Sequence, residues 1–562
     1  MLTVDRRSDV MIPPRATAST PSASVISAAL VALATLAFRT MAQGRLQNDH
    51  YMHLAWAQQI LLGDVPGRDF VDPGMPLMYT LSALLQHAWP GPFTEVVLTS
   101  AMLALAAGLT YWFVRSLTGS WHLAIVAVLI EVSLRPRLYS YPKILMPALV
   151  LTAFLAYARR PTTARLTIVS LCTAIAFLLR YDLGAFAFVS VALGIAILGL
   201  QSTKAVIKEW VRYALVTAAA LVPYVLFVQS AEGIVENVRE GLEFTKGEAH
   251  QFLFSWSEFP AFQRVPLFDD VNAAAWLFYG SYGILAVSAG LLLARLRRDR
   301  DEMLAAAAVA TALLACYGVV ILRHPLAARV PDVAAVLAIA GTWSVSALGA
   351  PLWRTFAIRP WRSAIATAAL ACTVALTAVS VWQLGRVEES FERTRLRYGL
   401  PKVGERIAAL AVAGTAWPWT WYWPGGDPPD ALQYLNTCTE TGDRVLVTWS
   451  APEYYFFARR GFAAGHALFA SSRSFATQRD RLKMLSRIRR ERVPIVLVNE
   501  TNRAQFASAY PELNAYVQEH YAPVAQFTIR DGSLIGIAAR RDARALETYG
   551  PAASPCRFAR GD

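Results

Sequence analysis

Carboxylates and histidines follow directly after the first long apolar run of this chain. The stretch "QNDHYMHLAW" places Asp49, His50 and His53 within about one helical turn of one another. A carboxylate here could take the proton from a hydroxyl nucleophile or orient a substrate. It could also cap a helix expected over 50–62, with Asn48 or Asp49 as the first residue, and the two roles are compatible. Asp49 is therefore the first candidate for a catalytic base.

The two histidines share one face of that helix because they are three residues apart. With Asp49 they could bind a metal ion, but no third ligand follows at a suitable spacing. Structural hydrogen bonding is the more common role of such histidines. We therefore predict no metal and no cofactor, and we keep His50 as a substrate contact.

A second polar cluster, "GRDFVDPGMP", contains Arg68, Asp69 and Asp72 among glycines and prolines. Asp, Gly and Pro are typical turn residues, so turn formation alone could explain the pattern. The functional interpretation is a loop that places a second carboxylate, or the Arg68 cation, against a substrate.

Three cations lie in one short loop, "SLRPRLYSYPKILMP", which contains Arg135, Arg137 and Lys143. Arg binds phosphate through its planar fork, so an anion site is one interpretation. Snorkelling to lipid headgroups is the alternative. Arg180 and Tyr181 lie in another such loop, "LLRYDLGAF". This repetition of charge is what a site for an anionic lipid headgroup would require.

The elements that must position these residues are membrane helices. Of the 562 residues, 55% are hydrophobic and 17% charged, in repeated apolar blocks, whereas soluble proteins contain about 25% charged residues. Lipid leaves backbone groups without water, so the blocks are expected to be helices. We predict about eleven spans, near 23–42, 93–114, 121–134, 144–158, 164–179, 184–200, 210–229, 272–294, 303–322, 332–350 and 363–384.

The distribution of basic residues predicts the orientation. The net charge of +13 could suggest nucleic acid, but the cations form short clusters between apolar blocks, "RLRRDRDE" most of all. The positive-inside rule then places a tail, 1–22, in the cytoplasm and the loop 43–92 outside. The segment 76–89 is too short to cross comfortably and is expected to be a re-entrant or juxtamembrane helix. The membrane domain is 23–384.

The remaining part, 385–562, is predicted to be a small extracytoplasmic α/β domain. "DRVLVTW" and "VPIVLVNE" are typical of buried strands, and "APVAQFTIRDGSLIGIAAR" of a hairpin turning at Asp531 and Gly532. Helices are expected over 451–460, 479–492 and 511–521. On an oxidising face, a disulfide between Cys438 and Cys556 becomes plausible, although the sequence does not decide whether it forms.

These features together resemble the GT-C glycosyltransferases of the protein-mannosyltransferase and aminoarabinose-transferase superfamily. Their first outside loop opens with an acidic pair and continues to a stretch like "RDFVDPGMPL". Asp49 matches the first acidic position, while His50 stands where a second acidic residue is common. Lys143 falls where some relatives have a functional Asp or Lys. Arg329 and Asp332 loosely match a later element, from which a His is absent.

The resemblance implies a multi-pass enzyme of the bacterial inner membrane that uses a polyprenyl-phosphate-linked sugar. It would transfer the sugar with inversion to a hydroxyl of a glycan, lipid or protein outside the cytoplasm. Asp49 would be the base, and Asp69 or Asp72 would position hydroxyls. The phosphate would be held by cations, which stabilise the charge that develops on the leaving group. These are Arg135, Arg137, Lys143 and Arg180, with Arg68 and Tyr181 as further substrate contacts.

Other functions remain open. A transporter or flippase for lipid-linked sugars should carry charges in mid-span and broken helices in symmetric halves. No convincing internal repeat is visible, and the charges cluster in loops. A membrane anchor for the last domain would not need so many spans. A polymerase that joins whole lipid-linked glycans is closer to the main hypothesis and harder to separate from it.

Overall fold

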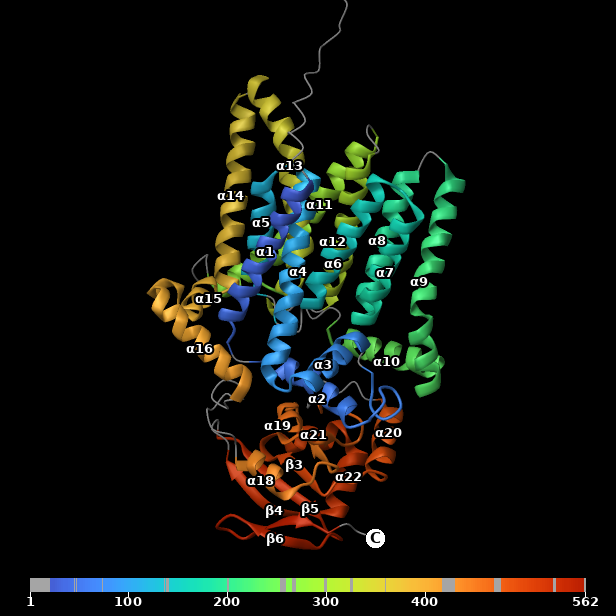
Figure 1. Cartoon of the computed structure of the whole chain (residues 1–562), viewed down its shortest axis with the longest axis vertical. Coiled ribbons are helices and arrows are strands. Elements are labelled where there is room, and N and C mark those ends of the chain that lie inside the picture. Colours follow the sequence, from blue (N-terminus) through green and yellow to red (C-terminus); the bar gives the residue numbers. More distant parts are fainter. Residues whose placement is uncertain are drawn as a thin grey trace, which may run out of the picture.

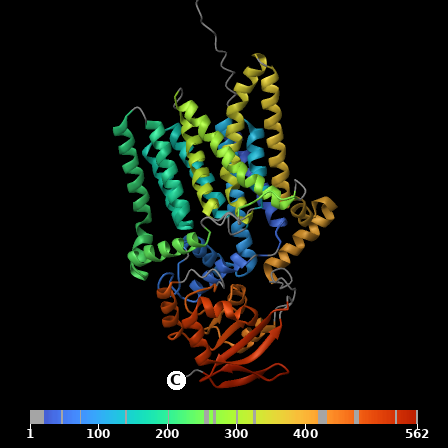
Figure 2. The same cartoon turned by 180° about the vertical axis from the view of Figure 1, so that it is seen from behind.

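The chain forms a helical bundle with a sheet-containing domain at one end (Figure 1). This computed structural model describes residues 21–44, 46, 48–72, 74–135, 137, 141–199, 202–252, 259–264, 269–297, 301–323, 327–358, 360–416, 430–469, 477–528 and 532–559. A layer of short helices lies between the bundle and the C-terminal domain, and the view from behind shows the same three levels (Figure 2).

Within the described ranges, nine helices are long and apolar enough to cross a membrane. They are α1 (Pro21–Met41), α4 (Pro92–Thr118), α6 (Tyr141–Arg159), α8 (Tyr181–Gly199), α9 (Thr203–Ala231), α11 (Asp270–Leu296), α12 (Glu302–Arg323), α13 (Ala334–Ile358) and α14 (Pro360–Leu384). The predicted polytopic α-helical class is therefore confirmed.

Two shorter apolar helices occupy the remaining predicted span positions. They are α5 (Trp121–Ser133) and α7 (Thr163–Leu179). Side chains cap both at their starts: the Ser120 hydroxyl accepts from the Leu123 amide, and the Thr162 hydroxyl accepts from the Arg165 amide. Because these helices are short for a bilayer, the predicted count of about eleven spans stays a prediction.

The centre of the bundle is α6. Of its most apolar stretch, 83% is buried inside the protein, compared with 17% for α9 and 11% for α1. Small residues allow close helix contact in such a bundle. At Gly108 of α4, an added Cβ would come within 2.9 Å of the Ala28 carbonyl oxygen in α1. The α1–α4 contact therefore requires the absence of a side chain at this position.

The intermediate layer contains α2 (Asn48–Leu61), α3 (Pro76–Ala88) and α10 (Ile234–Phe252). The segment expected to be a short juxtamembrane or re-entrant helix is α3. Two further helices, α15 (Val387–Thr394) and α16 (Leu400–Ala416), lie beside the bundle near the same level. The first predicted loop and the C-terminal domain therefore lie at one end of the bundle.

The C-terminal domain is built on a five-stranded sheet in the order β2-β1-β3-β5-β4. β1 runs parallel to β2 and β3, whereas β5 runs antiparallel to β3 and β4. The strands are β1 (Arg444–Val447), β2 (Gly461–Phe462), β3 (Ile495–Asn499), β4 (Tyr521–Thr528) and β5 (Leu534–Arg540). Both predicted buried strands and the predicted hairpin strands are present; Asp531 of the expected turn lies outside the described residues.

Helices flank this sheet and include the three that were predicted. They are α18 (Asp430–Cys438), α19 (Glu453–Ala458), α20 (Gln478–Ile488), α21 (Arg503–Ala509) and α22 (Pro511–His520). A second, two-stranded sheet joins β6 (Ala545–Tyr549) to β7 (Ser554–Phe558). The disulfide that the sequence left undecided is formed, and it links Cys438 of α18 to Cys556 of β7.

Candidate functional site

Helix α2 lies buried between the bundle and the C-terminal domain and packs against α19. Its His50 and His53 side chains are only 2% and 1% exposed. The Tyr51 ring contacts the Phe457 ring at a centroid distance of 5.4 Å. Asp49 belongs to the first turn of α2, one helical turn before His53, but its side chain lies outside the described residues.

His53 is a buried imidazole close to a cation. Burial, and to a smaller extent the positive charge of Lys143, lower the pKa of its ring to about 4. Neither ring nitrogen has a hydrogen-bond partner among the described residues, and the ring lies 5.7 Å from that of Trp56. His53 is therefore neutral near pH 7, and its position shows that α2 lies close to the Lys143 cation of the bundle.

Lys143, at the start of α6, forms a buried ion pair with Asp332. The Nζ–Oδ2 distance is 2.6 Å, and the two side chains are 7% and 11% exposed. Asp332 comes from the 3₁₀ helix η3 (Ala327–Val333), which also brings Arg329 Nη1 to 3.7 Å from the same carboxylate oxygen. The Tyr317 hydroxyl of α12 donates to the Lys143 carbonyl oxygen at 2.7 Å. Residues of η3 and α12 thus hold Lys143 by its ammonium group and by its backbone.

Arg180, between α7 and α8, adds a further cation to this cluster. It binds the Asp182 carboxylate at 2.6 Å and acts electrostatically on both Lys143 and Asp332. We call Lys143, Arg180, Arg329, Asp182 and Asp332 the inner cluster. Among the residues that the structure describes, it contains three cations and two carboxylates.

Asp72 is held by tyrosines from two spans. Its Oδ2 accepts hydrogen bonds from the Tyr224 hydroxyl at 2.7 Å and the Tyr181 hydroxyl at 3.2 Å. Its Oδ1 accepts from the Gly74 amide at 2.8 Å. Gly74 has a φ of +77°, and an added Cβ would lie 3.0 Å from the Tyr181 ring. The first loop is therefore fixed against α8 and α9, beside Arg180.

Arg68 and Asp69 face the C-terminal domain instead. They pair with each other at 2.7 Å, and Asp69 also accepts from the Val65 amide at 2.8 Å. Partial burial opposes ionisation of Asp69, but its hydrogen bonds to Arg68 and Val65 prevail and lower its pKa. Arg487 of α20 donates to the Arg68 carbonyl oxygen at 3.0 Å.

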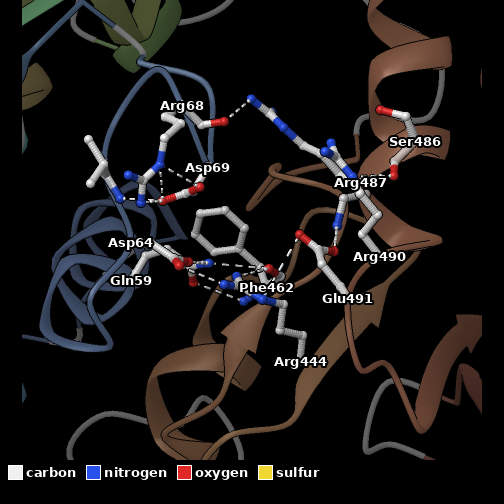
Figure 3. A network of polar contacts seen from close by, with 12 residues as sticks. Gln59, Asp64, Arg68, Asp69, Arg444, Phe462, Ser486, Arg487, Arg490 and Glu491 are labelled. Atoms are coloured by element: carbon white, nitrogen blue, oxygen red, sulfur yellow. Dashed lines mark hydrogen bonds and ion pairs between the residues drawn. The ribbon is translucent and has the colours of Figure 1, made fainter. Parts of the chain in front are cut away.

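Figure 3 shows how this loop is attached to the sheet domain. Arg444 of β1 binds the Asp64 carboxylate at 2.6 Å, and the Phe462 amide donates to the Gln59 side chain at 3.1 Å. Arg487 reaches the loop's backbone carbonyls from the other side, and Glu491 accepts from the Ala464 amide. We call Gln59, Asp64, Arg444, Arg487 and Glu491 the outer contact.

The predicted cations of the loop 135–143 do not form one group. Arg135 pairs with Glu389 of α15 at 2.8 Å, and Glu389 also binds Arg393. Arg137 is partly exposed. Lys143 belongs to the inner cluster together with Arg180, so the structure brings together only some of the residues that the sequence suggested.

Several polar residues of this region escaped the sequence analysis. Tyr224 and Tyr317 lie within apolar runs, where an aromatic residue indicates lipid contact. Arg39, buried at the end of α1, donates to the Tyr141 hydroxyl at 2.7 Å; a cation at the expected outer end of a span was a usable signal. Glu453 of α19 has a carboxylate oxygen without a hydrogen-bond partner among the described residues, and burial raises its pKa to about 7.

The arrangement is suited to binding an anion next to a hydroxyl substrate. Charge-assisted hydrogen bonds from Lys and Arg are the strong interactions available to a phosphate. Among the described residues, no group of three His, Cys, Asp or Glu side chains is placed to hold a metal ion.

Comparison with solved structures identifies the architecture. ArnT from Cupriavidus metallidurans, bound to undecaprenyl phosphate, matches with a TM-score of 0.50 and 13% identity over 93% of this chain and 99% of ArnT. The apo state of ArnT gives a TM-score of 0.48 at 13% identity over 92% of this chain and 98% of ArnT. No family model matches the sequence, and no curated protein matches it significantly. The chain therefore has a GT-C-like fold, similar to that of the aminoarabinose transferase ArnT.

Proposed function

We propose that this protein is a membrane glycosyltransferase. It would move a sugar from a polyprenyl-phosphate donor to an acceptor hydroxyl on the extracytoplasmic face, with inversion. The observation that carries the proposal is the inner cluster beside α2, in which the buried pair of Lys143 and Asp332 lies next to the partly exposed cations Arg180 and Arg329. The fold supports it, because ArnT, which has a similar fold, was solved with undecaprenyl phosphate bound.

In this proposal the donor phosphate lies beside Lys143 and Arg180. Asp332 and the Tyr317 hydroxyl hold Lys143 in place before the donor arrives, so the cation needs no reorganisation during reaction. As the bond from the sugar carbon to the phosphate oxygen breaks, negative charge builds on the phosphate and positive charge on the sugar. The fixed cations stabilise the first of these charges.

Asp49 is the proposed base for the acceptor hydroxyl. It lies in the first turn of α2, on the helix that also carries His53 beside Lys143. Inversion would require the base and the phosphate to lie on opposite sides of the sugar. Asp72 is a candidate for positioning sugar hydroxyls, since it accepts a hydrogen bond from Tyr181, the residue that follows Arg180. Asp69 would act indirectly, by fixing the shape of the first loop.

We further propose that this end of the bundle faces away from the cytoplasm of a bacterial cell, across the inner membrane. The disulfide between Cys438 and Cys556 supports this side, because disulfides persist in oxidising compartments. The end of α11 and the start of α12, between which the basic stretch falls in the sequence, lie at the opposite end of the bundle, as the positive-inside rule expects.

Binding of undecaprenyl phosphate to the purified full chain tests the phosphate site. The parent should bind it, and Lys143→Met should bind at least about tenfold more weakly, since a charged hydrogen bond contributes about 1.5–3 kcal/mol. Lys402→Met is the matched control, because Lys402 pairs with Glu405 on the surface of α16. Equal affinity of Lys143→Met and the parent would overturn the assignment of this site.

A further inference from the structure

Helix α10 has an apolar edge that is exposed to the surroundings. Val235, Val238 and Leu242 recur at the spacing of one helical face, and their exposed fractions are 84%, 53% and 55%. Ile234 extends the same edge. A contiguous apolar stripe of this kind marks a surface that binds protein or membrane.

The opposite edge of α10 is acidic and is held by the C-terminal domain. Glu236 binds Arg479 at 2.6 Å and Lys483 at 2.5 Å, both from α20, and Lys483 also binds Glu240. The hydrogen bond from Lys483 lowers the pKa of Glu236, which therefore stays ionised. These ion pairs fix the rotation of α10 about its axis, so that the apolar edge points away from the domain.

The position of α10 at the end of a span indicates what covers that edge. α9 ends at Ala231, and α10 begins at Ile234 after a turn at Gly233, whose φ is +89°. Val225 and Leu226, near the same end of α9, are exposed on a helix that is otherwise fit to cross the membrane. Both cartoon views show α10 lying across the end of the bundle (Figures 1 and 2). Its apolar edge thus continues the lipid-facing surface of α9.

We propose that α10 lies flat in the membrane interface, with Val235, Val238 and Leu242 among the acyl chains of the leaflet next to the C-terminal domain. A helix with one apolar and one charged face binds a bilayer surface in this way. Through Arg479 and Lys483, the C-terminal domain is then attached to a helix that is itself seated in lipid. This assignment is independent of the sugar-transfer proposal.

A photoreactive residue tests the assignment directly. Benzoylphenylalanine replaces Val238 in the full chain, which is reconstituted in vesicles of phosphatidylethanolamine and phosphatidylglycerol and irradiated. Mass spectrometry should detect acyl-chain adducts at position 238. The matched control carries the same residue in place of Leu546, an apolar side chain of β6 that is 61% exposed at the far end of the domain. Its lipid adducts should be at least about tenfold fewer.

A second measurement does not depend on the bulky probe. The variant Leu242→Cys carries a nitroxide label, and serine replaces Cys172, Cys316 and Cys372 so that only position 242 is labelled. Oxygen should relax this nitroxide more than a water-soluble nickel complex does. Adducts at position 238 with a second copy of the chain or another protein, or equal lipid labelling at 238 and 546, would overturn the proposal. So would a nitroxide at 242 that is more accessible to nickel than to oxygen.

Discussion

The inner cluster and the outer contact lie at the same end of the bundle, and both combine basic side chains with carboxylates. In the outer contact, Arg444 and Arg487 are balanced by Asp64 and Glu491, and backbone carbonyls of the loop accept the remaining hydrogen bonds. In the inner cluster, three cations share two carboxylates.

This difference in charge balance indicates that the two groups of residues have different roles. The outer contact is complete within the protein, which suits a joint that holds the first loop against the sheet domain. Among the described residues, the inner cluster has one more cation than carboxylates, and its cations could offer charge-assisted hydrogen bonds to an anion. Charge balance therefore distinguishes a structural contact from a candidate anion site better than the number of charged residues does.

Asp49→Asn should have the largest effect. If Asp49 is the base next to the inner cluster, the turnover number of sugar transfer should fall by about 10²–10⁴-fold, because proton removal contributes that much. Undecaprenyl phosphate binding and thermal unfolding should match the parent. Purified protein with a polyprenyl-phosphate sugar, taken from the lipids that accumulate in a deletion strain, gives the measurement. Unchanged turnover would remove Asp49 from the mechanism.

Lys143→Met should damage both activity and stability. Loss of a fixed donor to the developing phosphate charge should lower the rate by about 10²–10³-fold. The variant also removes the nearest cation from the buried Asp332 carboxylate, which should cost up to about 3–5 kcal/mol of unfolding free energy.

The double variant Lys143→Met/Asp332→Asn separates these two effects. It also removes the carboxylate charge that has lost Lys143, so thermal stability in detergent should return towards that of the parent while transfer stays low. If the double variant regained activity, the inner cluster would be structural like the outer contact, and the comparison would fail.

His53 should make the stability of the inner region depend on pH. The folded chain holds the His53 pKa at about 4, whereas an unfolded histidine titrates near 6.5. The unfolded chain therefore binds more protons between these values, so this contribution is full above pH 6.5 and is lost as the pH falls towards 4. The loss should reach about 3 kcal/mol. Denaturation measured at several pH values should show a shallower decline for His53→Gln than for the parent; equal slopes would contradict this.

Arg444→Met should have the smallest effect, and it should act only by loosening the contact between the first loop and the C-terminal domain. It leaves Asp64, which is 12% exposed, without its cation, at a cost of about 1–3 kcal/mol. We expect easier proteolytic release of the C-terminal domain, with undecaprenyl phosphate affinity unchanged. Arg557→Met, in a surface pair with Glu547, is the control. A drop in phosphate affinity equal to that of Lys143→Met would remove the distinction between the two regions.

The membrane architecture could be predicted from sequence because long apolar blocks leave few alternatives in lipid. Every predicted span coincides with a helix, and even the short segment 76–89 was recognised from its length as α3. Strands β1 and β3 were visible as bounded apolar runs and β4 and β5 as a hairpin, whereas β2, β6 and β7 were not predicted. Whether α5 and α7 cross the bilayer could not be settled by length alone.

The site was harder to predict because its contacts join distant segments. Sequence spacing grouped Lys143 with Arg135. In the structure, Lys143 binds Asp332, which is 189 residues away. Arg135 binds Glu389, which is 254 residues away. Local patterns carry no information about which outer loop approaches which. Tyr224 shows a second limit, since a hydroxyl that binds Asp72 is indistinguishable in sequence from an aromatic residue facing lipid.

The cross-link between Cys438 and Cys556 joins the first helix of the sheet domain to its last strand, across 118 residues. Both cysteines follow all the helices of the bundle in chain order, so the membrane spans must be synthesised before this bond can form. Maturation would then have a fixed order, in which synthesis of the spans precedes closure of the domain.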